Sequence, residues 1–287
     1  MKFITYEYEK ALNLGLLIDD EIVSFTSLGL NFKDMNDFII SHTEKEMETL
    51  SRTSKKDANL SLNDVKLKAP IIHPKQDIIC LGLNYLDHAK ESYKFKQIEP
   101  EEKREEAIYF AKRVNEAVGG RESIPAHANI TEKLDYEVEL AFIIKKDAKN
   151  VKREDAKEYI FGYTILNDIS ARDVQNKHKQ WYFGKSLDGT CPMGPFINTA
   201  LDTSSLAIKS YVNGELRQNS NTSLMIFDEG YVIEELSKGM TLKAGTIISM
   251  GTPSGVGMGF ELPKFLKSGD EIVCEIEGLG KLKNYIV

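Results

Sequence analysis

The chain has 287 residues, 41% of them hydrophobic and 28% charged, which is the balance of an ordinary globular protein able to bury a core without disulfides. Its net charge of −7 argues against a general electrostatic grip on nucleic acid. The first residues contain no apolar run typical of a signal peptide, and no stretch approaches the roughly 18 apolar residues of a membrane span. We therefore expect a cytoplasmic protein that binds neither nucleic acid nor membrane.

Residues 1–75 are predicted to form a small structural α+β domain. Short strands are indicated at 3–6, 14–18 and 22–25, and a helix from about 32 to 50. No group of polar side chains in this part suggests a site.

Residues 76–287 have a different character and are predicted to form the catalytic domain. An apolar strand at 78–82 is followed by a helix start at 86–94 and by a strongly charged stretch up to residue 113. This stretch is typical of a solvated helix face, and a mobile lid is the alternative. Further strands are predicted at 136–144, 160–167, 208–212, 246–250 and 271–277, so the fold class is mixed and β-rich (α+β), with largely antiparallel strands.

Three carboxylates stand at or near strand ends in this domain. Glu137 and Glu139 are two residues apart in a strand and so project from one face, and Asp168 ends a later strand. Neighbouring buried carboxylates repel each other unless a cation lies between them. Three oxygen ligands without Cys or His favour Mg²⁺, Mn²⁺ or Ca²⁺ over zinc, although a solvated acidic face gives the same pattern.

Polar side chains are concentrated after two of these strands. In the stretch 167–175, helical spacing would place Asp168, Arg172 and Gln175 on one face. Lys185 follows an aromatic run that begins at Trp181, and the glycine-rich loop 251–257 has backbone amides and the Thr252 hydroxyl that could hold an anion.

The order of these motifs resembles the fumarylacetoacetate hydrolase family, in particular its acylpyruvase and 2-hydroxyhepta-2,4-diene-1,7-dioate isomerase-like branch. The motifs are GLNYLDHAKE at 82–91, DYEVEL at 135–140, NDISARDVQ at 167–175, GKS at 184–186, VNGELRQ at 212–218, GTPSGVG at 251–257, KSGD at 267–270 and EGLG at 277–280. The match covers residues 76–287 in uninterrupted order, and residues 1–75 look like the family's small N-terminal domain.

The resemblance implies a β-roll catalytic domain, a homodimer, and binding of Mg²⁺ or Mn²⁺, with Ca²⁺ as a substitute in a crystal. It also assigns roles to individual positions. Glu137, Glu139 and Asp168 match the metal ligands, His88 and Glu91 the acid/base dyad, Lys185 the lysine near the metal, and Arg172, Gln175 and Thr252 substrate- or metal-shell positions, with Asn84 and Tyr85 as further substrate-binding candidates.

The implied reaction is hydrolysis of a C–C bond in an acylpyruvate-like 1,3-dicarbonyl acid, through an enolate stabilised by the metal. His88 would act as general base, oriented by Glu91 three residues further along the helix. Decarboxylation or tautomerisation of an oxaloacetate- or hydroxymuconate-type diacid passes through the same enolate and is the alternative. A non-catalytic metabolite-binding protein is the third hypothesis.

Two departures from the family pattern bear on the substrate. The segment 92–113 is longer and more charged than the usual link, although Phe110-Ala111-Lys112 is similar to the family's aromatic-x-Lys. Leu83 stands where some acylpyruvases carry an arginine. Both differences weaken the assignment of an acylpyruvate as the substrate.

Overall fold

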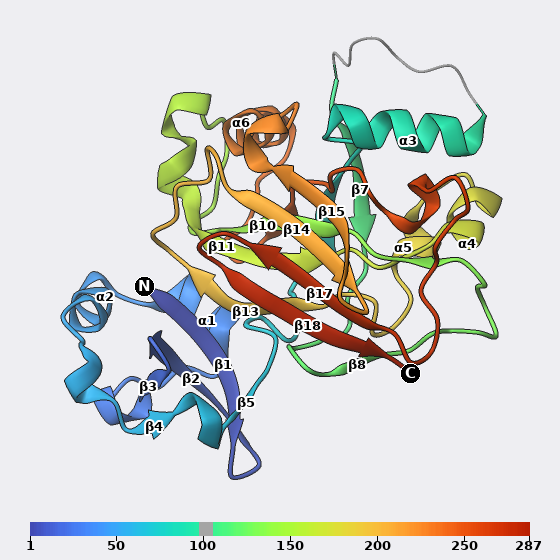
Figure 1. The fold of residues 1–287 in the computed structure, drawn as a ribbon. Helices are drawn as coiled ribbons and strands as arrows, with labels where there is room; N and C mark the ends of the chain where they lie inside the picture. Colours follow the sequence, from blue (N-terminus) through green and yellow to red (C-terminus); the bar gives the residue numbers. More distant parts are fainter. Residues whose placement is uncertain (98–105) are drawn as a thin grey trace.

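The computed structural model describes residues 1–97 and 106–287 and contains two main β-sheets with short helices around them (Figure 1). The prediction of a mixed, β-rich α+β fold is confirmed. Among the described residues, no helix is long and apolar enough to cross a membrane.

The larger sheet has eleven strands among the described residues, and β10 and β11 lie near its middle. Ten of them follow one another in the order β4 (Leu60–Ser61), β3 (Glu21–Ser24), β2 (Ala11–Ile18), β1 (Lys2–Tyr8), β13 (Met193–Asn198), β11 (Ile160–Asn167), β10 (Val138–Ile144), β16 (Ile247–Ser249), β6 (Ile78–Gly82) and β7 (Ile108–Lys112), and β5 (Lys66–Leu67) pairs with β1. The N-terminal strands thus join the same sheet through β1 and β13. The boundary between domains at residue 75 stays a prediction.

The second sheet lies across the first and packs on β10 and β11 through β14 and β17 (Figure 1). Its five strands follow the order β15 (Glu215–Asn221), β14 (Ala207–Val212), β17 (Glu271–Ile276), β18 (Gly280–Ile286) and β8 (Ser123–Ile124), and β9 (Leu134–Asp135) pairs separately with β12 (Ser170–Ala171). The turn Asn213-Gly214 joins β14 to β15 with positive φ at both residues, the backbone of the hairpin turn that this pair of residues predicts.

The helices are short. They are α1 (Met35–Ser41), α2 (Glu44–Ser51), α3 (Leu86–Lys96), α4 (Arg172–Lys177), α5 (Tyr182–Lys185) and α6 (Glu229–Gly239). The single helix expected at 32–50 is in fact two. Helix α1 ends at Ser41, and α2 begins after Thr43, whose side chain forms a capping box with Glu46.

The charged stretch 94–113 is only partly a helix face. Helix α3 ends at Lys96, and Ile108–Lys112 form strand β7, which pairs with β6. Most of the charge run, and with it the question of a lid, lies outside the described residues.

Strand β10 places the candidate site deep in the molecule. All seven of its residues are buried, because the large sheet is covered on one side by the second sheet and on the other by N-terminal and loop side chains. The carboxylates at its start are therefore held by a rigid scaffold rather than by a mobile loop.

Candidate active site

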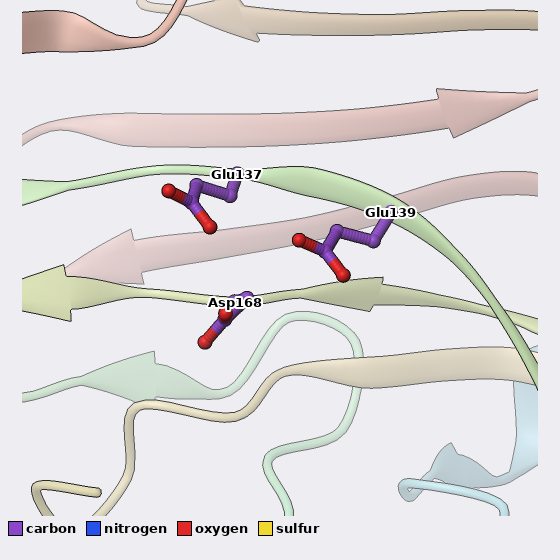
Figure 2. A group of neighbouring side chains, drawn as sticks. All are labelled: Glu137, Glu139 and Asp168. Carbon is purple, nitrogen blue, oxygen red and sulfur yellow. The ribbon is translucent and has the colours of Figure 1, made fainter. Parts of the chain in front are cut away.

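The three predicted metal ligands come together at one end of β10 and β11. Glu137 precedes β10, Glu139 lies within it, and Asp168 directly follows β11. Their carboxyl groups turn toward one another (Figure 2), and ligand oxygens from all three lie within 4.8 Å of each other. All three residues are buried, with 4% or less of their surface exposed.

Three buried cations surround two of these carboxylates. The Lys185 ammonium donates to Glu137 at 2.6 Å and to Asp168 at 2.7 Å. Lys112 lies 2.9 Å from the other oxygen of Asp168, and Arg172 lies 2.6 Å from Glu137. Burial alone would raise the pKa of Glu137, but Lys185 and Arg172 lower it to about 2.

Glu139 has a different environment. One of its oxygens accepts from the Ser249 hydroxyl at 2.5 Å and from the Gly251 amide at 3.0 Å. No ion pair to Glu139 is found within residues 1–97 and 106–287. Burial, followed by the charges of Asp168 and Glu137, raises the pKa of its carboxyl group well above the usual value.

The expected acid/base pair lies on α3. His88 is buried and directs Nδ1 to the Glu91 carboxylate at 3.5 Å, while Glu91 accepts the Gly255 amide at 2.9 Å. Glu91 is thus fixed by the glycine-rich loop and can orient the imidazole. His88 also lines a cavity that Glu137, Glu139 and Lys185 line from other elements.

The other predicted residues are brought to this cavity to different degrees. Gln175, Arg172 and Thr252 line it. Arg172 and Gln175 share one face of α4, with a hydrogen bond of 3.3 Å. Asp168, however, lies before β12 and not in this helix, so the expectation that all three occupy one helical face was wrong.

Asn84 and Tyr85 are buried but do not line the cavity. The Asn84 amide is saturated by backbone groups: it donates to the carbonyls of Phe227 and Met250 and accepts the amide of Phe227. It joins α3 to the strand end at Met250. The Tyr85 hydroxyl is buried without a hydrogen-bond partner among the described residues, and burial and the nearby Glu139 raise its pKa.

Several residues of the site were not predicted. Lys112 is completely buried, and its ammonium also donates to the backbone carbonyls of Ile169 and Lys185. Asp135 accepts Arg172 at 2.9 Å and the amides of Gly257 and Met258. The resemblance of Phe110-Ala111-Lys112 to the family's aromatic-x-Lys was the available signal for Lys112, and Asp135 stood in the motif DYEVEL without a predicted role.

Gln218 connects the second sheet to the site. Its side chain accepts the Val138 amide at 3.1 Å and donates to Thr252 Oγ1 at 2.7 Å. The Thr252 hydroxyl in turn donates to the Val138 carbonyl at 2.9 Å. Thr252 is therefore bound to the start of β10, next to two of the carboxylates.

These residues fit a divalent cation. The donor set consists of hard carboxylate oxygens, and Glu139 is a buried carboxylate whose repulsion by its neighbours a cation would relieve. Glu137, Glu139 and Asp168 would hold the ion, which would supply a Lewis acid at the floor of the cavity.

The comparisons with known proteins agree with the order of motifs. The family described as fumarylacetoacetate (FAA) hydrolase C-terminal matches residues 77–287. Oxaloacetate tautomerase YisK of Bacillus subtilis (strain 168) is 41% identical over 305 aligned residues, which cover all of both chains.

Two solved structures have the same fold over the whole chain. A fumarylacetoacetate hydrolase from the psychrophile Exiguobacterium antarcticum is 36% identical, with a TM-score of 0.86 over 100% of this chain and 99% of that one. A 5-carboxymethyl-2-hydroxymuconate delta-isomerase from Mycobacterium smegmatis is 29% identical, with a TM-score of 0.75 over 100% and 99%. With its motifs, its fold and its buried carboxylates all in agreement, the chain belongs to the fumarylacetoacetate hydrolase family.

Proposed function

We propose that this protein is a divalent-metal-dependent tautomerase that interconverts the keto and enol forms of a short 2-oxo dicarboxylate of the oxaloacetate type. The observation that carries the proposal is the placement of His88, supported by Glu91, in the same cavity as the buried carboxylates. The relative named as an oxaloacetate tautomerase and the structural neighbour named as an isomerase support this class of reaction over the hydrolysis preferred from sequence.

The charges around the cavity favour an anionic substrate. The buried groups are Asp135, Glu137, Glu139 and Asp168 against Lys112, Arg172 and Lys185. With Glu91 beside His88, five negative and three positive charges leave a formal charge of −2, which a divalent cation would neutralise. The attraction for a dicarboxylate would then come from the cation itself and from Lys185 and Arg172, which line the cavity and are buried, so that solvent screens them little.

Tautomerisation requires only that one proton move between carbon 3 and the oxygen on carbon 2. His88 is suited to exchange this proton, because it lines the cavity and its ring is oriented by Glu91 through Nδ1. Lys185 supplies positive charge next to the carboxylates that would hold the cation. The cation, when bound, would stabilise the negative charge that develops on the oxo oxygen. No water molecule is consumed.

Hydrolysis of a C–C bond in a 1,3-dicarbonyl acid is the second candidate. It is favoured by the same pair of residues, because a base fixed by Glu91 and Gly255 could also activate a water molecule. The reaction adds water across the bond and yields two products, whereas tautomerisation changes no composition. Decarboxylation of the same diacid would release CO₂.

The test is to add enol-form oxaloacetate to the purified protein with Mg²⁺ or Mn²⁺ and to follow the ultraviolet absorbance of the enol. We expect ketonisation to be accelerated, with mass spectrometry detecting neither cleavage products nor CO₂ loss beyond the background. EDTA and the variants E139Q and H88Q should each reduce the rate by at least about 10²-fold.

The variant E275Q is the matched control for E139Q, because Glu275 lies on β17 and forms an ion pair only with Lys281 among the described residues. It should retain the wild-type rate. Two products from a 1,3-diketo acid, without ketonisation, would establish the hydrolase instead. Binding of Mg²⁺ and oxaloacetate without any turnover would favour the metabolite-binding hypothesis.

A further inference from the structure

An aromatic wall forms part of the cavity and is not used by the proposed proton transfer. Trp181 and Phe110 line the cavity together with Leu83. Trp181 stands at the start of α5 and Lys185 at its end, and the Lys185 amide donates to the Trp181 carbonyl at 3.0 Å. One helical turn therefore directs both the indole and the ammonium into the same cavity.

The indole of Trp181 is wedged against backbone. A methyl group added at Gly82 would overlap the six-membered ring, so the ring lies directly on strand β6. It also forms an edge-to-face pair with Phe110, at 5.1 Å between ring centroids and 69° between planes, and packs against the cluster of Leu83, Ala89 and Tyr93. Phe110 in turn lies 5.1 Å from the Lys185 ammonium. The indole therefore cannot move toward β6 to make room for a longer substrate.

The polar and apolar residues that line the cavity favour different parts of a substrate. The polar residues, Lys185, Arg172 and the carboxylates, would accommodate charged oxygens with a cation bound. Leu83, Phe110 and Trp181 offer no cation to a carboxylate, and burying an unpaired carboxylate against them is unfavourable.

We propose that Trp181 is the residue that sets substrate length at this site, restricting it to 2-oxo diacids of about four carbons. This inference rests on the proposed function, since it specifies the substrate class of the same cavity. A four-carbon diacid keeps both carboxylates near the polar residues. A seven-carbon diacid would drive its distal carboxylate or its chain into the indole and the phenyl ring.

The experiment compares wild type with W181A and W181L on two substrates, oxaloacetate and the seven-carbon 2-hydroxyhepta-2,4-diene-1,7-dioate. Each is followed by ultraviolet absorbance with Mg²⁺ present, and the readout is the ratio of kcat/KM for the long substrate to that for the short one. We expect both variants to raise this ratio by at least about 10-fold, mainly through a gain on the long substrate.

Phe183 provides a matched control, because it is an exposed aromatic residue in the same helical turn and does not line the cavity. F183A should leave the ratio within about twofold of wild type. W181L keeps an apolar side chain next to Phe110, so it still tests the inference if W181A does not fold. A ratio unchanged in both Trp181 variants, or an equal loss on both substrates, would overturn the inference.

A binding measurement separates this inference from the proposed function. Protection against thermal unfolding is measured with Mg²⁺ and saturated dicarboxylates of increasing length, from oxalate to pimelate, and requires no turnover. We expect wild type to be protected by the short members alone, and W181A and W181L also by the long ones. Wild type could fail to ketonise oxaloacetate while longer dicarboxylates protect the Trp181 variants and not wild type. In that case the proposed reaction is wrong, but Trp181 still limits the length of the ligand.

Discussion

At the scale of single residues, Glu139 differs from the other two members of the triad in what balances its charge. Glu137 and Asp168 each contact buried cations, whereas Glu139 accepts hydrogen bonds only from Ser249 and Gly251 among the described residues. Its raised pKa follows from burial and from the two neighbouring carboxylates. Without a cation, the ionised form of Glu139 is thus unfavourable in the folded protein.

The variant E139Q should therefore stabilise the metal-free protein by on the order of 1–3 kcal/mol while abolishing its stabilisation by Mg²⁺. A carboxyl whose pKa is raised by folding holds its proton in the folded state. Wild-type stability in EDTA should accordingly fall as the pH rises from about 4.3, the unfolded value, toward the raised value. Urea unfolding between pH 5 and 8 should give this slope for wild type and a smaller one for E139Q.

The variant E137Q serves as the contrast. The pKa of Glu137 is lowered to about 2 by Lys185 and Arg172, so removing its charge leaves two buried cations poorly compensated. It should lose about 3 kcal/mol, the opposite sign to E139Q. Persistent Mg²⁺ stabilisation of E139Q would mean that the ion is not held by this triad.

Lys112 has a positioning role that can be tested by stability. Its ammonium contacts Asp168 and the carbonyls of Ile169 and Lys185, so one side chain holds a metal-ligand candidate, the residue after it and the end of α5. K112M should lower the free energy of unfolding by about 3 kcal/mol and weaken Mg²⁺ binding, measured by urea titration and calorimetry. K283M, which removes a half-exposed ion pair with Glu271, should cost less than about 1 kcal/mol.

Sequence reasoning found the triad because strand periodicity and like-charge repulsion act locally. Glu137 and Glu139 stand two residues apart at the start of β10, one just before the strand and one within it, and the family motifs placed Asp168 beside them. Lys112 and Asp135 could not be derived in this way. Their partners are brought to them by sheet pairing between distant segments, which no local pattern encodes.

At the scale of elements, helix α3 is attached to the glycine-rich loop by the residue expected to orient the base. The Gly255 amide donates to Glu91, and a methyl group at Gly259 would collide with the same carboxylate. Glycine is required at residue 255, where φ is positive and a methyl group would collide with the backbone carbonyl of Arg217. The contact between Glu91 and Gly255 couples the position of the helix to the loop that carries Thr252.

The variant E91Q should keep the hydrogen bond to Gly255, because the amide oxygen still accepts it, but should lose the negative charge beside His88 Nδ1. We expect kcat for ketonisation to fall by about 10²-fold with KM changed less than about threefold. D87N is the control on the same helix, since Asp87 is exposed and pairs with Lys90. An unchanged kcat in E91Q would remove Glu91 from the acid/base machinery.

The elements themselves were predictable to different degrees. The central strands were indicated by apolar runs bounded by turns, as at β10 and β11. The break between α1 and α2 was missed although Thr43 and Glu46 carry the capping-box signal. The strand β7 was hidden in a charged context, because its pairing with β6 rather than its own composition determines its structure.

At the scale of the whole molecule, the N-terminal part and the catalytic part share one sheet through β1 and β13. The predicted homodimer and the cytoplasmic location stay predictions, and light scattering on the purified protein tests the first. A second connection between the two parts lies directly after β5, where Lys68 contacts Glu122.

Glu122 is the centre of this connection. Its carboxylate contacts Lys68, which follows β5, pairs with Lys66 at 3.1 Å, and accepts the Gly119 amide at 2.7 Å. The carbonyl of Glu122 accepts the Asn284 side chain from β18 at 2.9 Å. One residue thus joins the end of the N-terminal part to the last strand of the chain.

The pH dependence of stability tests this connection. Burial would raise the pKa of Glu122, but its bonds to Lys68, Gly119 and Lys66 prevail and lower it. A carboxylate with a lowered folded pKa stabilises the protein above its unfolded value of about 4.3, and the contribution is lost as the pH falls through the folded value. E122Q should therefore be less stable than wild type by about 1–2 kcal/mol at pH 7, and the difference should shrink below pH 4. Urea unfolding at both pH values measures this, with E275Q as a control for the loss of one charge. A difference that did not depend on pH would mean that Glu122 acts through packing, and that the two parts of the molecule are joined by the sheet alone.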